Sequence, residues 1–185
     1  MTAPSSSEPA PGGQQAGPAG PTSWVLDPSS SSVSFTHKHT FGLLTMSGTF
    51  GQVAGSGEIL ADGTGRGRLE IDASTLSTKN AKRDEHLRSP DFFHVKEHPQ
   101  IIVDITKAVP QGTDTVLADG TLTVAGQSRP LSVTAQITDA SDRAITLKTT
   151  IDIDRGDFGM TWNQLGIIKG LAHMSVVARF VSSPQ

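Results

Sequence analysis

The sequence has no cysteine among its 185 residues. This absence excludes a disulfide framework, a thiolate metal site and a cysteine nucleophile. The chain also lacks a glycine loop that could hold a phosphate group with a lysine, and it lacks the nucleophile elbow of a serine hydrolase. Serine, histidine and aspartate occur without a spacing that links them into a triad, so we predict no catalytic residues.

A strong charge of one sign and a long apolar run are missing as well. The net charge is -3 and the pI is about 6.0, which argues against nucleic acid or an anionic membrane as a partner. The chain has no run of about 20 apolar residues, so we predict no stable insertion into a membrane. Residues 1–22 lack the basic start and apolar centre of a secretory signal. We therefore expect a cytoplasmic protein as the chain is written, or a periplasmic or extracellular one if a signal was removed.

The beginning of the chain differs in composition from the rest. Residues 1–22 are rich in proline, alanine, glycine and serine, and such a segment buries too little apolar surface to offset the entropy of ordering. We predict a disordered arm over residues 1–22 and one folded domain over residues 23–185, which is an ordinary length for a single domain.

Most of the folded part alternates apolar and polar residues, the pattern of half-buried strands. The alternating runs are Val33–His39, Leu44–Phe50, Gly57–Leu60, Gly67–Asp72, Ile101–Ile105, Val116–Val124, Leu131–Ile137, Ile145–Ile153 and Met174–Phe180. Roughly eight strands joined by short turns predict an all-β antiparallel sandwich or closed barrel. The periodicity does not choose between the two, although glycines within the long strands favour a sheet that coils and closes.

One stretch, residues 80–99, has a helical pattern instead. Its first part is mostly charged and predicts a helix over about residues 80–88. The Ser-Pro-Asp sequence at 89–91 has the hydroxyl, proline and carboxylate of a helix start, so we predict a second short helix from about Pro90. The large apolar side chains of this stretch should face the strands: Leu87, Phe92 and Phe93.

Several groups of residues match, in order, the pattern of one protein family. The central group is Asn80, Arg83, Asp84, His86, Leu87, Ser89, Asp91, Phe92, Phe93, Val95 and Pro99. The other groups are Val33, Phe35, Lys38 and His39; Gly120, Leu122, Thr123, Val124, Gly126 and Pro130; and Arg155, Asp157, Phe158 and Gly159. From about Trp24 to Val181 the sequence thus resembles the YceI family, the polyisoprenoid-binding, lipocalin-like proteins of bacteria.

This resemblance implies an eight-stranded antiparallel lipocalin-like barrel with a short helical insertion, whose interior holds a long isoprenoid or similar lipid. Related barrels are often dimers, so a homodimer is a further expectation. The sequence departs from the family pattern at His37, His94 and His98, where an apolar residue, an acidic residue and a tyrosine are usual.

We predict a non-catalytic protein that binds, transports, stores or sequesters an amphiphilic polyisoprenoid or quinone-like lipid in an apolar tunnel, and no other cofactor. Burial of a tail contributes about 0.8 kcal/mol per CH₂. The expected lipid contacts are Phe35, His39, Phe41, Leu44, Leu87, Phe92, Phe93, Ile101, Val103, Leu122, Phe158, Met160, Trp162 and Asn163. Among them His39 and Asn163, together with Arg83, would meet the polar head group.

Two other functions remain open. His37 and His39 share one face of a strand, and with His86, His94 or His98 they could hold a metal for an enzyme that acts on a lipophilic substrate. No carboxylate accompanies the pair locally, so a metal site is not predicted. The other alternative is a protein-binding β module whose interior is filled by its own side chains, as in most β domains.

Overall fold

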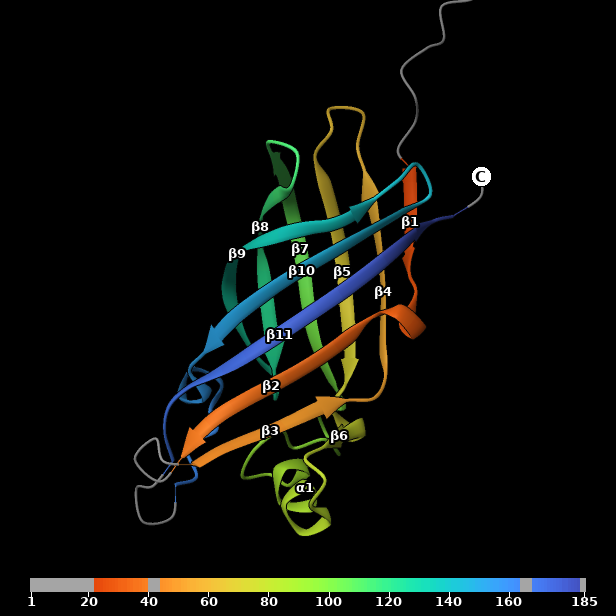
Figure 1. The fold of residues 1–185 in the computed structure, drawn as a ribbon. Coiled ribbons are helices and arrows are strands. Elements are labelled where there is room, and N and C mark those ends of the chain that lie inside the picture. The colour runs from red at the N-terminus through yellow and green to blue at the C-terminus, as the bar shows by residue number, and fades with distance from the viewer. Residues whose placement is uncertain (1–21, 40–43, 164–167, 184–185) are drawn as a thin grey trace, which may run out of the picture.

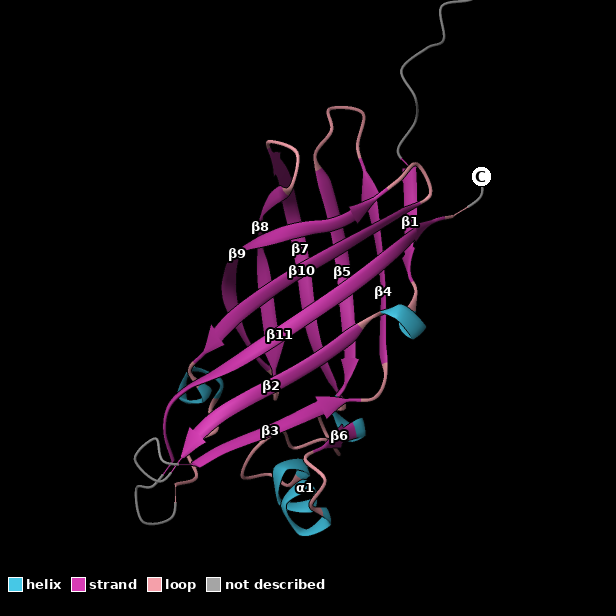
Figure 2. Ribbon diagram, viewed as in Figure 1, coloured by secondary structure: helices cyan, strands magenta, loops and turns pink. Residues whose placement is uncertain are grey.

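The structure is a computed structural model that describes residues 22–39, 44–163 and 168–183. The arm predicted over residues 1–22 lies outside this part of the chain apart from Thr22, and Phe41 lies outside it as well. The described residues form one antiparallel sheet with a single α-helix at one end, as Figures 1 and 2 show.

Eight of the described strands form a closed ring, in the order β1-β4-β5-β7-β8-β9-β10-β11. They are β1 Thr22–Leu26, β4 Val53–Ile59, β5 Gly65–Asp72, β7 Gln100–Gln111, β8 Thr115–Val124, β9 Gln127–Ala140, β10 Ala144–Ile153 and β11 Ile168–Ser182. The ring closes where β1 pairs with β11, with Val25 opposite Val181. Closure leaves no open edge in this part of the sheet. The predicted eight-stranded antiparallel barrel is confirmed, although β1 was not predicted as a strand.

The sheet continues past the ring at the end nearest the α-helix (Figure 1). There β2 (Ser32–His39) pairs with the first part of β11, β3 (Leu44–Phe50) pairs with β2, and β6 (Leu76–Ser77) pairs with β3. A short 3₁₀ turn, η1 (Pro28–Ser30), separates β1 from β2. β11 therefore pairs with β2 between Ile168 and Val177 and with β1 from Phe180 to Ser182.

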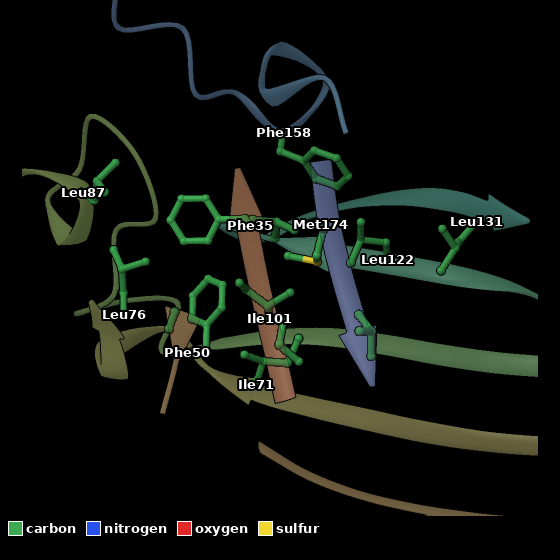
Figure 3. Packing of buried hydrophobic residues seen from close by; sticks show 14 of the residues in the cluster. Phe35, Phe50, Ile71, Leu76, Leu87, Ile101, Leu122, Leu131, Phe158 and Met174 are labelled. Carbon is green, nitrogen blue, oxygen red and sulfur yellow. The ribbon is translucent and has the colours of Figure 1, made fainter. Parts of the chain in front are cut away.

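The interior follows the alternation of the sequence. Its most deeply buried large side chains are Val33, Ile71, Leu76 and Ile101, each at most 2 % exposed. Figure 3 shows several of them converging from different strands with Phe35, Phe50 and Met174. Burial of each such side chain is worth about 1.5–3 kcal/mol, so these alternating positions supply much of the stability of the barrel.

The α-helix, α1 (Ala81–Arg88), begins where the sequence predicted. The Asn80 side chain accepts a hydrogen bond from the backbone N–H of Arg83 at 3.0 Å, which satisfies one of the unpaired donors at the helix start. Leu87 is buried as expected. None of the described helices is long and apolar enough to cross a membrane.

The second helix, predicted from Pro90, is wrong. Residues 89–97 form successive turns. The backbone N–H groups of Phe93 and Val95 donate to the carbonyls of Leu87 and Arg88, at 3.0 and 3.1 Å. The segment 89–97 thus folds back on the last turn of α1 and satisfies the open carbonyl groups of that helix. It forms turns against α1 instead of a new helix.

Candidate functional site

A cavity of about 260 Å³ lies at the end of the barrel beside α1. Its wall combines strand residues with α1, the turns at 89–97 and the segment 155–162. We call it the helix-side cavity. Seven of the predicted lipid contacts line it: Phe35, Leu87, Phe92, Phe93, Ile101, Met160 and Trp162.

Three phenylalanines from separate parts of the chain meet in this cavity wall. The ring of Phe50 lies 5.6 Å from that of Phe35 and 5.9 Å from that of Phe93, the second pair edge to face. Gly48 allows this packing, because a Cβ at that position would lie 2.5 Å from the Phe35 ring. The wall is therefore apolar and closely packed, and it connects β2 and β3 to the turn that carries Phe93.

A second aromatic group lies nearer the solvent. His86 on α1 contacts the rings of Phe92 and Trp162, with centroids 5.2 and 4.5 Å away. His86 Nε2 also lies 3.1 Å from a carboxylate oxygen of Asp91, and these two side chains are 39 % and 51 % exposed. The helix-side cavity thus has an apolar interior and a partly polar edge.

Hydrogen bonds fasten α1 to the barrel beside the cavity. The buried Asp84 carboxylate accepts from the backbone N–H of Thr78 at 2.8 Å and from its hydroxyl. Arg83 donates to the hydroxyl and the carbonyl of Thr78 at 2.7 and 3.0 Å. Arg88 donates to the carbonyl of Leu76 on β6. These contacts fix Leu87, on the same helix, against the cavity.

The ionisation of Asp84 reflects this environment. Burial by itself raises the pKa of its carboxyl group, but the hydrogen bonds from Thr78 and the positive charges of Arg88 and Arg83 together bring the pKa below its ordinary value of 3.8. Asp84 is consequently a carboxylate at neutral pH. The sequence left two interpretations of the charged helix face open, solvation with weak surface ion pairs or an anchor formed by Arg83 or Asp84. The burial and hydrogen bonds of Asp84 support the anchor.

Two arginines also border the helix-side cavity. Besides Arg83, Arg155 lines it and donates from Nη1 to the carbonyl of Trp162 at 2.6 Å. Burial lowers the pKa of the Arg155 guanidinium from its ordinary value, yet arginine keeps its charge in proteins. Arg155 was not among the predicted site residues. Its position in the glycine-rich segment with Phe158 and Met160 was the available signal.

A second cavity of about 240 Å³ occupies the opposite half of the barrel. We call it the hairpin-side cavity, because the β4-β5 hairpin borders it together with Trp24 and Phe180. Its wall is mostly apolar, includes small residues such as Ala118 and Ala135, and has charged residues of the hairpin at its border, namely Glu58, Arg66 and Arg68. Val103, a predicted lipid contact, lines this cavity rather than the first.

A layer of side chains lies between the two cavities along the strands. On β8, Leu122 stands between Val124 of the helix-side cavity and Ala118 of the hairpin-side cavity. On β11, Val176 and Ala178 likewise lie between positions that line the two cavities. All three are at most 7 % exposed. Leu122, a predicted lipid contact, therefore belongs to the partition and not to a described cavity wall.

The remaining predicted contacts lie elsewhere. Phe158 is buried in the core, with the Arg129 guanidinium 6.0 Å from its ring centre. Leu44 is 55 % exposed, because it stands at the end of the β2-β3 ladder opposite His39, beyond the packed part of the sheet. Asn163 is exposed, a few residues after η3 (Arg155–Phe158). None of these three lines either cavity, and the His39 side chain lies outside the described part of the structure.

The metal alternative rests on a pair of histidines, of which the His39 side chain lies outside the described part of the structure. His37 is buried in the wall of the helix-side cavity, which His86 also borders. His94 and His98 lie together on the turn after Phe93, next to Glu97. Among the described residues, this last group is the only one in which three potential ligand atoms come close together.

Comparisons with other proteins place this geometry in a family. The YceI-like domain model matches residues 24–181. A UPF0312 protein of Pectobacterium atrosepticum is 32 % identical over 74 residues, 40 % of this chain and 38 % of that protein. Another, of Azotobacter vinelandii, is 30 % identical over 106 residues, 56 % and 55 % of the two chains. The match thus spans less than two thirds of the length of these curated relatives.

Solved structures agree in fold. BcnA of Burkholderia cenocepacia superimposes with a TM-score of 0.74 at 17 % identity, over 83 % of this chain and 98 % of its own. A polyisoprenoid binding domain from Saccharophagus degradans gives a TM-score of 0.72 at 17 % identity, over 86 % and 98 %. With the domain match covering nearly the whole barrel, the chain belongs to the YceI family.

Proposed function

We propose that this protein binds an amphiphilic lipid with an isoprenoid-type tail in the helix-side cavity and carries or stores it without changing it chemically. The observation that carries the proposal is a cavity inside one end of a closed barrel whose wall is almost entirely apolar. An eight-stranded barrel can hold one elongated ligand in this way. The polyisoprenoid binding domain with the same fold supports the choice of ligand class.

The tail would supply most of the binding energy. Each CH₂ group transferred from water into the cavity contributes about 0.8 kcal/mol. The aromatic rings of Phe35, Phe50 and Phe93 offer flat apolar surfaces without a polar group that would need a partner. Such a wall recognises the apolar character of a tail more than its detailed structure, so we propose that several related lipids bind.

The head group would lie at the polar edge of the cavity. Arg83, His86 and Arg155 border it there. A guanidinium group donates hydrogen bonds and accepts none. We therefore propose a head group with oxygen acceptors, such as the carbonyl groups of a quinone.

The polar groups around the cavity support binding rather than catalysis. Arg83 holds Thr78, and Arg155 holds the carbonyl of Trp162. Asp84 is buried beneath Thr78 and carries a carboxylate that is already hydrogen bonded. These interactions hold α1 and the segment 155–162 in place around the cavity. A site that retains a ligand without reacting with it needs such a stable wall.

Mass spectrometry tests the proposal directly. The purified protein is measured intact under native conditions, and an organic extract of the same sample is analysed for small molecules. We expect one prenyl or quinone-like compound per chain. An extract without such a compound, from a protein that also takes up no added prenyl quinone, would reject lipid carriage. The native mass also tests the expected homodimer.

A further inference from the structure

Three potential metal ligands share one turn of the backbone after Phe93. The N–H groups of Glu97 and His98 both donate to the carbonyl oxygen of His94, at 3.0 and 2.9 Å. Residues three and four apart in such a turn lie on the same side. The side chains of His94, Glu97 and His98 therefore project together.

The distances suit a small metal ion. His94 Nε2 lies 3.6 Å from Glu97 Oε1, and the two imidazole rings lie 5.8 Å apart between centres. One ligand atom from each of the three side chains lies within 4.8 Å of the other two. Bonds of about 2.0–2.2 Å to tetrahedral zinc separate ligand atoms by about 3.3–3.6 Å. The His94–Glu97 separation is already close to this spacing, and no pair exceeds it by more than about 1.5 Å.

The surroundings hold this group in place. The His98 ring packs on Gly126 in the turn between β8 and β9, where a Cβ would come within 2.6 Å of the ring. His94 has a φ of 48°, in the left-handed region that residues other than glycine rarely adopt. The turn is thus fixed on one side by the barrel and held in an unusual conformation at the first ligand.

We propose that His94, Glu97 and His98 bind one Zn²⁺ ion. Two imidazoles and a carboxylate are ligands that zinc prefers, and a water molecule would complete a tetrahedral site. The His94 and Glu97 side chains are 28 % and 69 % exposed, so the ion can enter from solvent. None of the three residues lines the helix-side cavity. The bound ion would stabilise the turn next to Phe93, and this site is independent of the proposed lipid binding.

Isothermal titration calorimetry with zinc chloride tests the site. The full chain is treated with a chelator, exchanged into chelator-free buffer and titrated beside three variants. Glu97→Gln removes the carboxylate at an exposed position, and His98→Ala removes one imidazole. His173→Ala is the matched control, because His173 is an exposed histidine that pairs with Asp152 on a different part of the sheet.

We expect one zinc ion per wild-type chain, at least tenfold weaker binding in Glu97→Gln and His98→Ala, and unchanged binding in His173→Ala. Circular dichroism of the metal-free proteins checks that each is folded. If His98→Ala fails to fold, Glu97→Gln decides. Absence of zinc binding in the wild type, or wild-type affinity in Glu97→Gln, would overturn the proposal.

Discussion

The two ends of the barrel each enclose a cavity, but different elements border the two cavities. The helix-side cavity is enclosed by elements outside the ring, namely α1, the turns at 89–97 and the segment 155–162, and it has arginines and a histidine at its edge. The hairpin-side cavity is bounded by the strands of the ring and the β4-β5 hairpin. Charged residues of the hairpin, Glu58, Arg66 and Arg68, also line the hairpin-side cavity, and Arg66 pairs with Glu58 there. The two cavities thus have similar volumes but different borders, and the proposed function assigns the head group to the helix side.

The largest effect on lipid binding is expected from a charge placed in the helix-side cavity. Phe93→Asp puts a carboxylate against Phe50, and burying an unpaired charge is far more costly than the loss of one ring contact. We expect loss of at least about 90 % of the bound lipid from a barrel that remains folded, measured by mass spectrometry of extracts and by circular dichroism.

Leu117→Asp is the matched control for this variant, because Leu117 is 44 % exposed on β8 and lines neither cavity. It should retain lipid like the wild type. Full lipid retention by a folded Phe93→Asp protein would remove Phe93 from the binding site.

The partition between the cavities offers a second, smaller perturbation. Leu122→Ala should lower the free energy of unfolding by about 2–5 kcal/mol, as expected for a buried leucine that leaves a void. It should also join the two cavities, so that the variant retains lipids with longer tails than the wild type does. Chemical denaturation and mass spectrometry of the bound lipids measure the two effects.

Leu76→Ala provides the comparison, since Leu76 is fully buried on β6 and lies outside the partition. It should lose similar stability without any change in tail length. Equal tail lengths in both variants and the wild type would show that the Leu122 layer does not limit the tail.

The attachment of α1 gives a third test, at the helix side alone. Asp84→Ala leaves the N–H and hydroxyl of Thr78 without their acceptor, which should lower the free energy of unfolding by about 1–3 kcal/mol. Asp91→Ala, whose carboxylate is 51 % exposed, should cost less than about 1 kcal/mol. Urea denaturation compares them, and equal losses would contradict a special role for Asp84.

The smallest expected effect is the pH dependence of the difference in unfolding free energy between the wild type and Asp84→Ala. Because the pKa of Asp84 is lowered in the folded protein, its carboxylate stabilises the fold above the ordinary value of 3.8, and the contribution is lost as the pH falls through the folded-state pKa. The stability gap between wild type and Asp84→Ala should therefore be constant above about pH 5 and shrink below about pH 4. A gap that stays constant throughout acid titration would exclude this linkage.

The sequence predicted the parts of the fold that depend on local pattern. Alternation identified the long strands, and Asn80 correctly marked the start of α1. The five-residue β1 was missed, because its role depends on pairing with β11 at the far end of the chain. The prediction of a second helix was wrong, because it considered only the residues at the expected helix start. In the structure the backbone N–H groups of Phe93 and Val95 donate to open carbonyl groups at the end of α1. The disordered arm and the cellular location stay predictions.

The candidate site was predictable only in part for a related reason. Periodicity reports which face of a strand is inward, so Phe35 and Ile101 were identified as lining residues. It does not report the depth of a residue along the barrel, which separates Leu122 in the partition from Val103 in the hairpin-side cavity. Nor does it decide whether Asp84 is solvated or anchors the helix, because its hydrogen bonds come from Thr78, a neighbouring loop residue.

The pairing of β11 with both β1 and β2 bears on how the barrel folds. The backbone N–H of Arg179 on β11 donates to the hydroxyl of Ser31, a residue 148 positions earlier in the sequence. Contacts of such long range are slow to form, because the intervening chain must first be brought together. During synthesis, β1 and β2 would each keep one unpaired edge until β11 emerges from the ribosome. Closure of the ring would then be a late event in folding. The partly folded chain would be most prone to aggregation while these edges remain unpaired.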